Sequence, residues 1–335
     1  MSTAFVQTPY CRIKLHSERL VVLAPPVPAQ PDQLLQQIPL LELEQLTITE
    51  DVQITSQAVG ALLRRGLPLT YLDARGQILG QTLATPNAHS ALRLRQYQRT
   101  LEPAFGLAVA RQIVAAKILN QRRVIQRAET NHPGDVEADL LRLEQLASRV
   151  ETAQSLDELR GLEGAASATY YPAWASFLPA GFPFERRSRR PPHNPVNACL
   201  SYAAVLLYAE LVALIHRQGL DPGLGTLHST DDGRWSLALD LMEPFRPAVV
   251  EAATLRAFTL GVMTAAGFEP HEGGVYLNPD GRRKFLEQYH RRLDREFLSE
   301  HAGQRTTLRS QLAATVLGFK QALDDPAGFR PFRLN

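Results

Sequence analysis

The stretch ACLSYAAVLLYAELVALI, from Ala198 to Ile215, is apolar on nearly every side and decides what class of protein this chain is. It lies at the short end of the roughly 17–25 residues that a membrane-spanning helix requires. It also contains Ser201, two tyrosines and Glu210. A helix that is apolar all round is equally typical of the central helix of a soluble domain. We therefore predict a buried helix and no association with a membrane.

The composition around this stretch is that of an ordinary soluble protein. The chain has 335 residues, of which 44% are hydrophobic and 21% are charged, so two domains of roughly 150 residues are expected. A net charge of +2 does not by itself indicate a nucleic-acid partner. The two cysteines, Cys11 and Cys199, do not make a disulfide framework. The first residues carry no secretory signal, so we expect a cytoplasmic protein.

Residues 1–90 have the pattern of short strands. LTITEDVQIT alternates apolar and polar residues, with a period of two. Ser56 is suited to cap a helix over Gln57–Arg65, and Gly66 to end it. Two strand pairs are also expected: Arg12–Leu15 with Leu20–Leu23, and LPLTYLD with QILGQTL across a turn at Ala74, Arg75 and Gly76.

From Ala91 onward the pattern changes to helices. In LAVARQIVAAKILNQRRVIQR, apolar residues recur at helical spacing from Leu107 to Ile125. Further helices are expected at Glu137–Val150, Leu156–Gly161, Ala248–Ala266, Arg282–Ser299 and Thr307–Leu323. We predict an α+β protein of two domains: a small β-rich N-terminal domain over residues 1–90 and a larger all-α domain over residues 91–335.

Three places combine an ionisable side chain with an apolar surrounding. Glu163 lies among small residues in LRGLEGAASATYY, where an acid at a helix start would be the structural explanation. His228 follows GLDPGLGTL, and a lone histidine is often structural. Asp240 and Glu243 interrupt the apolar run LALDLME. They would share one face of a helix but point to opposite sides of a strand, and periodicity leaves both open.

Together these residues form a candidate site for a divalent cation. Carboxylates suit Mg²⁺ or Mn²⁺, and an imidazole shifts the preference toward Mn²⁺ or a later metal. Such a site polarises a phosphate and activates an attacking oxygen. The proline-rich loop ERRSRRPPHNPVN contributes arginine forks that match phosphate oxygens, although a solvated basic loop is the alternative. Its arginines are Arg186, Arg187, Arg189 and Arg190, and Arg246 adds a cation after Glu243.

Four motifs in this order resemble the Cas1 endonuclease family, the integrase of CRISPR adaptation. They are LEG around Glu163, RRSRRPPHNPVNACLSY, GLDPGLGTLH and LDLMEPFRP. AAKILNQRRVIQR and ITSQAVGALLRRGLPLTYLD extend the resemblance over almost the whole chain. The resemblance implies a β domain joined to a helical domain and favours the helical interpretation of the Asp240 segment. One departure is His193-Asn194, where the family suggests an acidic residue before Pro195.

The resemblance also implies a function. Glu163, His228 and Glu243 match the metal ligands of the family, and Asp240 matches a neighbouring acid of the catalytic group. Family members form homodimers, and two dimers join a dimer of the small partner Cas2. They insert short foreign DNA segments into a CRISPR array. We expect Mg²⁺ or Mn²⁺ at the scissile phosphodiester, attack by a DNA 3′-hydroxyl, and DNA contacts from the arginine loop and Arg246.

Two other functions remain open from the residues alone. The same metal chemistry would serve a DNA nuclease that cuts branched DNA without integration. A DNA-binding scaffold subunit without catalytic activity would use Glu163 and Glu243 only to pair with arginines. The integrase would act on a protospacer duplex, a CRISPR repeat and branched DNA.

Overall fold

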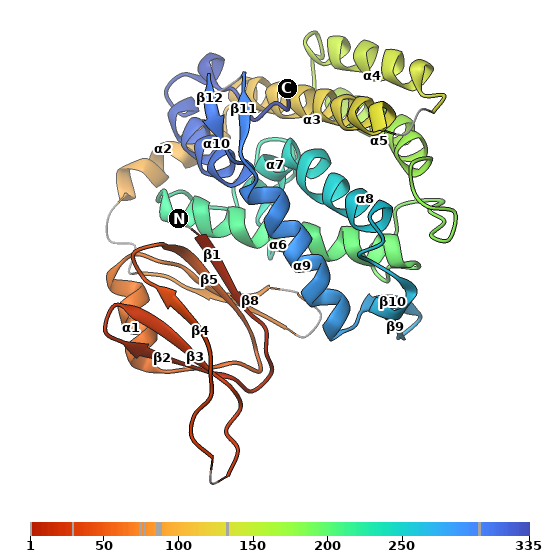
Figure 1. Ribbon diagram of the computed structural model, residues 1–335. Helices are drawn as coiled ribbons and strands as arrows, with labels where there is room; N and C mark the ends of the chain where they lie inside the picture. Colours follow the sequence, from red (N-terminus) through yellow and green to blue (C-terminus); the bar gives the residue numbers. More distant parts are fainter. Residues whose placement is uncertain are drawn as a thin grey trace. The chain divides into compact units, whose positions relative to one another are not determined.

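The structure is a computed structural model that describes residues 2–28, 30–73, 76, 78–84, 89–131, 134–300 and 303–335 (Figure 1). The chain divides into two compact units. The first comprises Met1–Arg93 and Val212–Leu220, and the second comprises Leu94–Leu211 and Asp221–Asn335. The sequence did not indicate that residues 212–220 belong with the first unit. The division at residue 90 stays a prediction.

The first unit contains two four-stranded sheets, with strand orders β1-β5-β7-β8 and β4-β3-β2-β6. β5 pairs in parallel with β1 and β7, whereas β2 and β3 form the predicted antiparallel hairpin. The strands are β1 (Ser2–Val6), β2 (Arg12–His16), β3 (Arg19–Leu23), β4 (Leu34–Pro39), β5 (Leu43–Thr49), β6 (Gln53–Ile54), β7 (Leu69–Leu72) and β8 (Ile78–Thr82).

The alternating pattern of these strands supplies the core of the first unit. Ile13, Leu46 and Ile48 are fully buried there, together with Leu62 of helix α1 (Ser56–Arg64). The cap of α1 lies one residue earlier than predicted, because Thr55 rather than Ser56 accepts from a backbone N–H of the first turn. Gly66 follows the helix at φ 63°, a conformation that glycine adopts without strain. In the predicted turn after β7, Ala74 and Arg75 lie outside the described residues.

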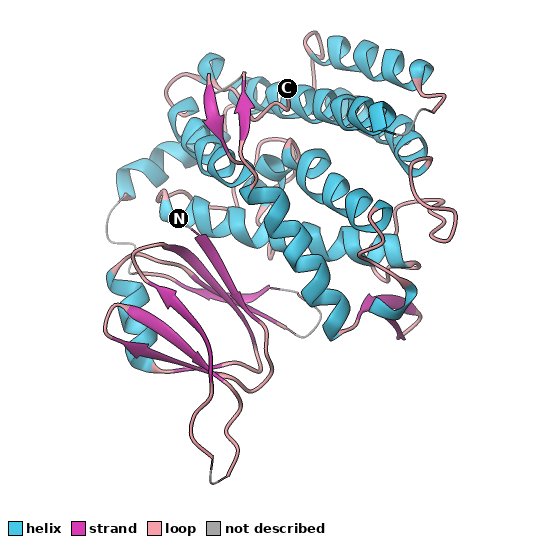
Figure 2. Cartoon of the chain, viewed as in Figure 1, coloured by secondary structure: helices cyan, strands magenta, loops and turns pink. Residues whose placement is uncertain are grey.

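The second unit is built mainly of helices (Figure 2). Helix α3 packs against α4, α5, α7 and the π-helix η1, so it is the element around which the site is arranged. The helices are α2 (Ser90–Thr100, which begins in the first unit), α3 (Pro103–Asn131), α4 (Glu137–Val150), α5 (Leu156–Ala175), α6 (Pro195–Arg217), α7 (Ser236–Met242), η1 (Pro247–Glu251), α8 (Ala252–Thr259), η2 (Ala265–Gly267), α9 (Pro279–Asp294), α10 (Leu308–Ala322) and η3 (Pro326–Gly328).

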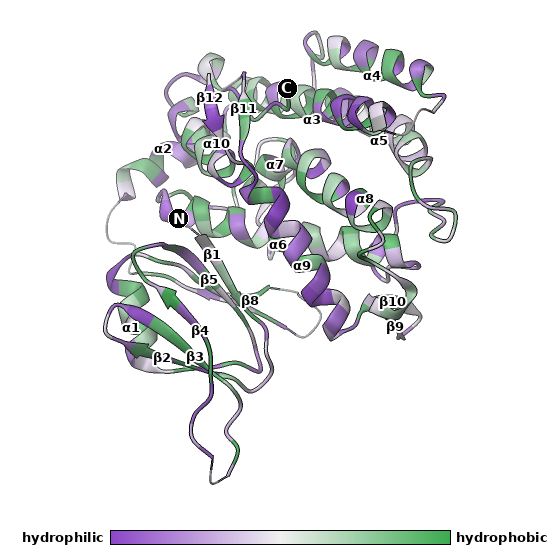
Figure 3. Cartoon of the chain, in the orientation of Figure 1, coloured by the Kyte–Doolittle hydropathy of each residue, from purple (hydrophilic) through white to green (hydrophobic). Residues whose placement is uncertain are grey.

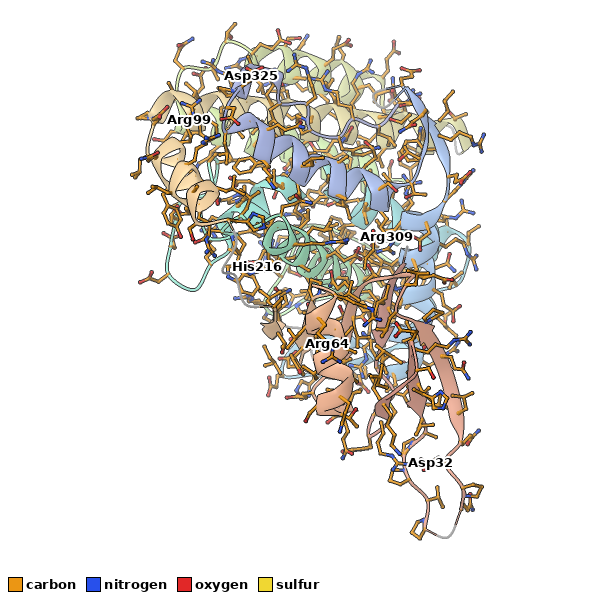
Figure 4. The ribbon with its side chains drawn as sticks, turned by 90° about the vertical axis from the view of Figure 1, so that its left-hand side faces the viewer. Asp32, Arg64, Arg99, His216, Arg309 and Asp325 are labelled. Carbon is orange, nitrogen blue, oxygen red and sulfur yellow. The ribbon has the colours of Figure 1, made fainter. Side chains whose placement is uncertain are left out.

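Helix α6 contains the apolar stretch from Ala198 to Ile215. By length and composition it could cross a membrane, but 72% of its most apolar window is buried inside the protein. Figure 3 shows how its hydrophobic residues contrast with the largely hydrophilic α9. Glu210 is tolerated in α6 because it accepts from the Tyr289 hydroxyl at 3.0 Å and pairs with Arg309 at 2.5 Å. Arg309, labelled in Figure 4, lies at the start of α10.

The prediction that the second part is all-α was wrong. The second unit contains two antiparallel strand pairs, β9 (Phe268–His271) with β10 (Gly274–Leu277) and β11 (Phe297–Ser299) with β12 (Gln304–Thr306). Glu272 and Gly273 join the first pair with φ of 44° and 75°, the left-handed pair that closes a two-residue hairpin. The helix expected over Arg282–Ser299 ends at Asp294, because Arg295 turns to extended backbone.

Candidate functional site

Three elements of the second unit bring two carboxylates onto one ammonium group. Lys117 lies on α3, Glu163 on α5, and Glu243 follows directly after α7. The Lys117 Nζ forms ion pairs with Glu163 Oε1 and with Glu243 Oε2. The side chains of Lys117 and Glu243 are each 7% exposed, whereas that of Glu163 is 30% exposed. The two predicted acids therefore converge on a single cation position that solvent reaches from the side of Glu163.

The helical interpretation of the Asp240 segment is confirmed, because Asp240 lies within α7. The structural explanation considered for Glu163, an acid at a helix start, is wrong. Helix α5 begins at Leu156, where Ser155 caps it, so Glu163 lies in the helix interior. Its charge is compensated by Lys117 rather than by the helix end.

Neighbouring charges keep Glu243 and Lys117 ionised. Burial pushes the pKa of Glu243 upward, but the charges of Lys117 and Arg246 outweigh it and lower the pKa to about 2. Burial alone would lower the pKa of Lys117, yet Glu243 and Glu163 raise it. Glu243 is thus a carboxylate and Lys117 an ammonium at any physiological pH.

Asp240 contacts the loop that carries His228, and its predicted part in catalysis stays a prediction. It is fully buried, and its carboxylate accepts from the backbone N–H groups of Thr226, Leu227 and His228. Its Oδ1 also lies 2.6 Å from His228 Nδ1. A carboxylate at Nδ1 fixes the ring orientation and leaves Nε2 as the atom that binds a metal or accepts a proton. Asp240 therefore positions His228 and is occupied by these contacts.

The loop that carries His228 fits closely around this carboxylate. A Cβ added to Gly225 would lie 2.7 Å from the Ser236 Cβ and 3.0 Å from Asp240 Oδ2. Glycine is therefore required for the backbone to approach α7 so closely.

Beyond Glu243, further charged and polar side chains contact one another in the protein interior. Arg246 Nη1 lies 3.3 Å from Glu243 Oε1, and its Nε lies 3.9 Å from Glu251 Oε1. Tyr171 donates to the same Glu251 oxygen at 3.2 Å. The Arg246 side chain is only 9% exposed, so its charge is directed at these two carboxylates. Its predicted contact with DNA stays a prediction.

The predicted basic loop separates into inward and outward arginines. Arg187 donates to Asn197 Oδ1 at 2.9 Å and to Ser201 Oγ at 3.1 Å, both on α6. Burial lowers the pKa of its guanidinium to about 10. Arg186, Arg189 and Arg190 are exposed. Asn194, at the departure from the expected acidic residue, accepts from the Asn197 backbone N–H in the first turn of α6.

The predicted ligands do not form a closed metal site by themselves. Within the described ranges, no three side chains of His, Cys, Asp or Glu are placed to hold an ion together. Glu163 and Glu243 both pair with the Lys117 ammonium instead. The donor set nevertheless fits a hard divalent cation, since two ionised carboxylates already converge on one positive charge. Glu163, Glu243 and His228 Nε2 are the groups that would hold it.

Sequence reasoning missed Lys117. The signal was present in VAAKIL, where a lone lysine lies among residues of a helix that the periodicity places in the core. Asn120, one turn later on the same helix, was also missed. It donates to the Pro244 carbonyl at 2.6 Å and thereby anchors the residue that follows Glu243.

Comparison with known proteins gives the family. The family described as CRISPR associated protein Cas1 matches residues 4–291. A CRISPR-associated endonuclease Cas1 from Thermus thermophilus is 34% identical over 296 residues, which cover 88% of this chain and 90% of that protein. A Cas4 exonuclease/Cas1 endonuclease fusion from Rhodospirillum rubrum is 35% identical over 310 residues, covering 90% of this chain. The chain spans 52% of that fusion and 47% of a second one, from Geobacter sulfurreducens.

Solved structures share the fold. A casposase bound to an integration product superposes with a TM-score of 0.83 at 22% identity, covering 96% of this chain and 90% of the casposase. A Cas1 protein from Thermotoga maritima gives a TM-score of 0.79 at 23% identity, with 97% of both chains covered. The family match over most of the chain and the similarity to the Thermus protein lead to one conclusion: this chain belongs to the Cas1 family of CRISPR-associated proteins.

Proposed function

We propose that this protein is a metal-dependent DNA endonuclease and integrase that inserts short foreign DNA segments into a CRISPR array. The observation that carries the proposal is the convergence of Glu163 and Glu243 on one cation position, together with a His228 imidazole that Asp240 orients. The family match supports a nuclease or integrase. The fold shared with a casposase bound to an integration product is consistent with strand transfer.

Each residue of the proposed site has its own role. Mg²⁺ or Mn²⁺ bound by Glu163, Glu243 and His228 would polarise the scissile phosphate and favour deprotonation of the attacking 3′-hydroxyl. Asp240 holds the imidazole through Nδ1, so that Nε2 would be the atom that binds the metal. Lys117 and Arg246 keep the pKa of Glu243 low, so that this carboxylate stays ionised. The exposed Arg186, Arg189 and Arg190 bind backbone phosphates, which gives affinity without sequence preference.

The partners follow from the same proposal. We infer a homodimer that acts on a protospacer duplex and a CRISPR repeat in the cytoplasm. A structural neighbour in a Cas6-RT-Cas1–Cas2 complex, covering 100% of this chain with a TM-score of 0.72, supports Cas2 as the partner.

One observation specifically favours the scaffold as a second candidate. Glu163 and Glu243 both pair with protein cations, as they would if their role were only structural. A scaffold would bind branched DNA in a strongly salt-dependent manner and would be indifferent to divalent metal.

A strand-transfer assay separates the candidates. Labelled duplex with free 3′-hydroxyls is incubated with a supercoiled plasmid that carries a CRISPR repeat, with Cas2, and with Mn²⁺ or EDTA. We expect label to join the plasmid only with Mn²⁺, and His228→Ala to abolish joining while DNA binding persists. Nicking without joining would identify the nuclease, and binding that ignores EDTA would identify the scaffold.

A further inference from the structure

The Lys117 ammonium occupies the position that the proposed function assigns to a divalent metal. We propose that Lys117 is a tethered cation that holds Glu163 and Glu243 together when no metal is bound, and that it must leave them for the metal to bind. Lys117 would then be a positioning residue that sets the metal affinity of the site. This inference rests on the proposed metal site and adds a residue to it.

The geometry gives Lys117 this role. Its side chain is 7% exposed and extends from the buried face of α3, where Val114 and Ile118 are fully buried neighbours. The ammonium is thereby delivered to two carboxylates on two other elements, α5 and the end of α7. Without a cation between them, two ionised carboxylates converging at one point would repel each other. Lys117 supplies that cation from within the chain.

Charge balance explains why the lysine and the metal exclude each other. The three acids of this group, Glu163, Glu243 and Glu251, already face two cations, Lys117 and Arg246. A divalent ion added without displacement would place two further positive charges in a buried group with no new anion, which a low-dielectric surrounding disfavours strongly. Displacement of Lys117 removes one cation from the carboxylates. A DNA phosphate at the site would supply an anion for the displaced ammonium, so DNA and metal should bind cooperatively.

A purely structural ion pair predicts a different behaviour of Lys117. It would keep Lys117 in place whatever the metal concentration, and its removal would only destabilise the protein. The two roles therefore differ in the metal affinity of a variant that lacks the ammonium.

The first test is Mn²⁺ binding to the DNA-free full chain, measured by electron paramagnetic resonance for wild type, Lys117→Gln, Lys117→Arg and Glu163→Gln. We expect Lys117→Gln to bind Mn²⁺ about tenfold or more tightly, because the carboxylates are no longer occupied by a competing cation. Lys117→Arg keeps the charge and should bind no more tightly than wild type. Lys14→Gln, which removes an exposed lysine that pairs with Asp32, is the matched control and should be unchanged.

Failure of this inference and failure of the proposed function give different results. If Glu163→Gln weakens Mn²⁺ binding but Lys117→Gln leaves it equal or weaker, the metal site stands and the role of Lys117 is refuted. If Glu163→Gln binds Mn²⁺ as wild type does, the metal is held elsewhere and the proposed function itself loses its site.

A second measurement on the wild-type protein avoids any variant that fails to fold. The chain has four lysines, Lys14, Lys117, Lys284 and Lys320. With lysine labelled by ¹³C at Cε, each gives one resonance, and Lys→Arg substitutions at the other three positions assign that of Lys117 by elimination. We expect Mg²⁺ to move the Lys117 resonance alone, and further when duplex DNA is added. A Lys117 resonance that stays in place while Mg²⁺ saturates the protein would overturn the inference.

Discussion

The second unit contains two largely buried groups of ionisable side chains that differ in how completely their hydrogen-bonding groups are satisfied. The Glu210 cluster comprises Glu210, Tyr289, His290, Asp294 and Arg309. The Lys117 cluster comprises Lys117, Glu163, Glu243, Arg246 and Glu251. Both place a carboxylate and a guanidinium at under 10% exposure, with Glu210 at 2% and Arg309 at 7% in the first, and Glu243 at 7% and Arg246 at 9% in the second.

In the Glu210 cluster the hydrogen bonds are complete. Each oxygen of Glu210 has its own donor, and Arg309 donates from Nε to Asp294 at 2.6 Å and from Nη1 to Glu210 at 2.5 Å. In the Lys117 cluster, among the residues that the structure describes, Arg246 Nε and Glu251 Oε2 lack a hydrogen-bond partner, and Glu243 Oε2 is met by the ammonium that it shares with Glu163. One ammonium serves two acids there, and Glu163 opens to solvent.

The difference distinguishes a cluster with a structural role from a cluster that can bind a ligand. Buried charges are expensive unless they are paired and hydrogen-bonded, so a complete network needs no ligand to explain it. An incomplete network that reaches solvent has capacity left for one. The Glu210 cluster therefore explains how the apolar α6 tolerates a carboxylate, while the Lys117 cluster is the candidate catalytic group.

The largest effect is expected from a substitution that disrupts the Lys117 cluster. Glu163→Gln removes one carboxylate charge while keeping the shape of the side chain. We expect strand transfer to fall by roughly 10³-fold or more, because a bound metal contributes several kcal/mol of transition-state stabilisation. Gel electrophoresis of joined product measures the rate, and filter binding should show unchanged DNA affinity. Wild-type rates in this variant would contradict the comparison.

Breaking the Glu210 cluster should cost stability instead. Arg309→Met leaves Glu210 buried without its cation, and we expect the free energy of unfolding to fall by about 3–5 kcal/mol. Urea unfolding measures this loss, which Mn²⁺ should not restore. In the double variant Glu210→Leu/Arg309→Met most of it should be recovered. If Arg309→Met alone cost under about 1 kcal/mol, the Glu210 cluster would not be the structural element described here.

Asp240→Asn tests whether the Asp240 carboxylate supports metal binding and strand transfer by orienting His228. The amide keeps one acceptor oxygen but loses the charge that orients His228. We expect about a 10–100-fold loss of strand transfer or metal affinity, as for other residues that orient a ligand. Titration of activity with Mn²⁺ separates a loss of metal affinity from a loss of the strand-transfer rate. An unchanged Mn²⁺ dependence and rate would show that the Asp240–His228 contact is only structural.

The arginine loop offers a smaller contrast of the same kind. Arg189→Ala and Arg190→Ala should each weaken DNA binding and reduce the slope of log affinity against log salt by about 1. Arg187→Ala is the matched control, because its guanidinium is held by Asn197 and Ser201 and its loss should mainly lower stability. Equal salt slopes in all three variants would show that the inward and outward arginines do not differ in this way.

The smallest effect concerns pH. Burial, followed by the charge of Arg309, lowers the pKa of His290 from 6.5 to about 4. Because the folded pKa is depressed, the unfolded chain binds the proton first. Stability is therefore unaffected above about pH 6.5 and falls as the pH drops toward 4. Between pH 7.5 and 6 we expect a loss of about 0.8 kcal/mol, which His290→Asn should abolish in urea unfolding. The same slope in that variant would assign the pH dependence to other groups.

The sequence predicted much of the fold because period and turn chemistry are local. The β2–β3 hairpin, helix α1 and the helical character after residue 91 follow from alternation, capping and glycine signals. The short hairpins β9–β10 and β11–β12 were missed, since three- and four-residue strands carry too little periodicity. The exact cap of α1 depended on which of two adjacent hydroxyl residues meets the helix N–H.

The site was predicted less completely, because its contacts are non-local. Glu163, His228 and Glu243 were named from their apolar surroundings and from the family resemblance. Lys117, 46 residues before its partner Glu163, could not be linked to it by spacing. The contact of Asp240 with His228 depends on a loop that folds back onto α7, and the inward turn of Arg187 depends on α6. Neither is encoded in a motif.

The most direct test of the central claim is a diffraction experiment on crystals of the full chain with Mn²⁺, using the anomalous signal of the metal. We expect a peak between Glu163 and Glu243 with His228 Nε2 as a third ligand, and the Lys117 ammonium moved off both carboxylates. A peak elsewhere, or Lys117 still bridging the two acids at saturating Mn²⁺, would contradict it.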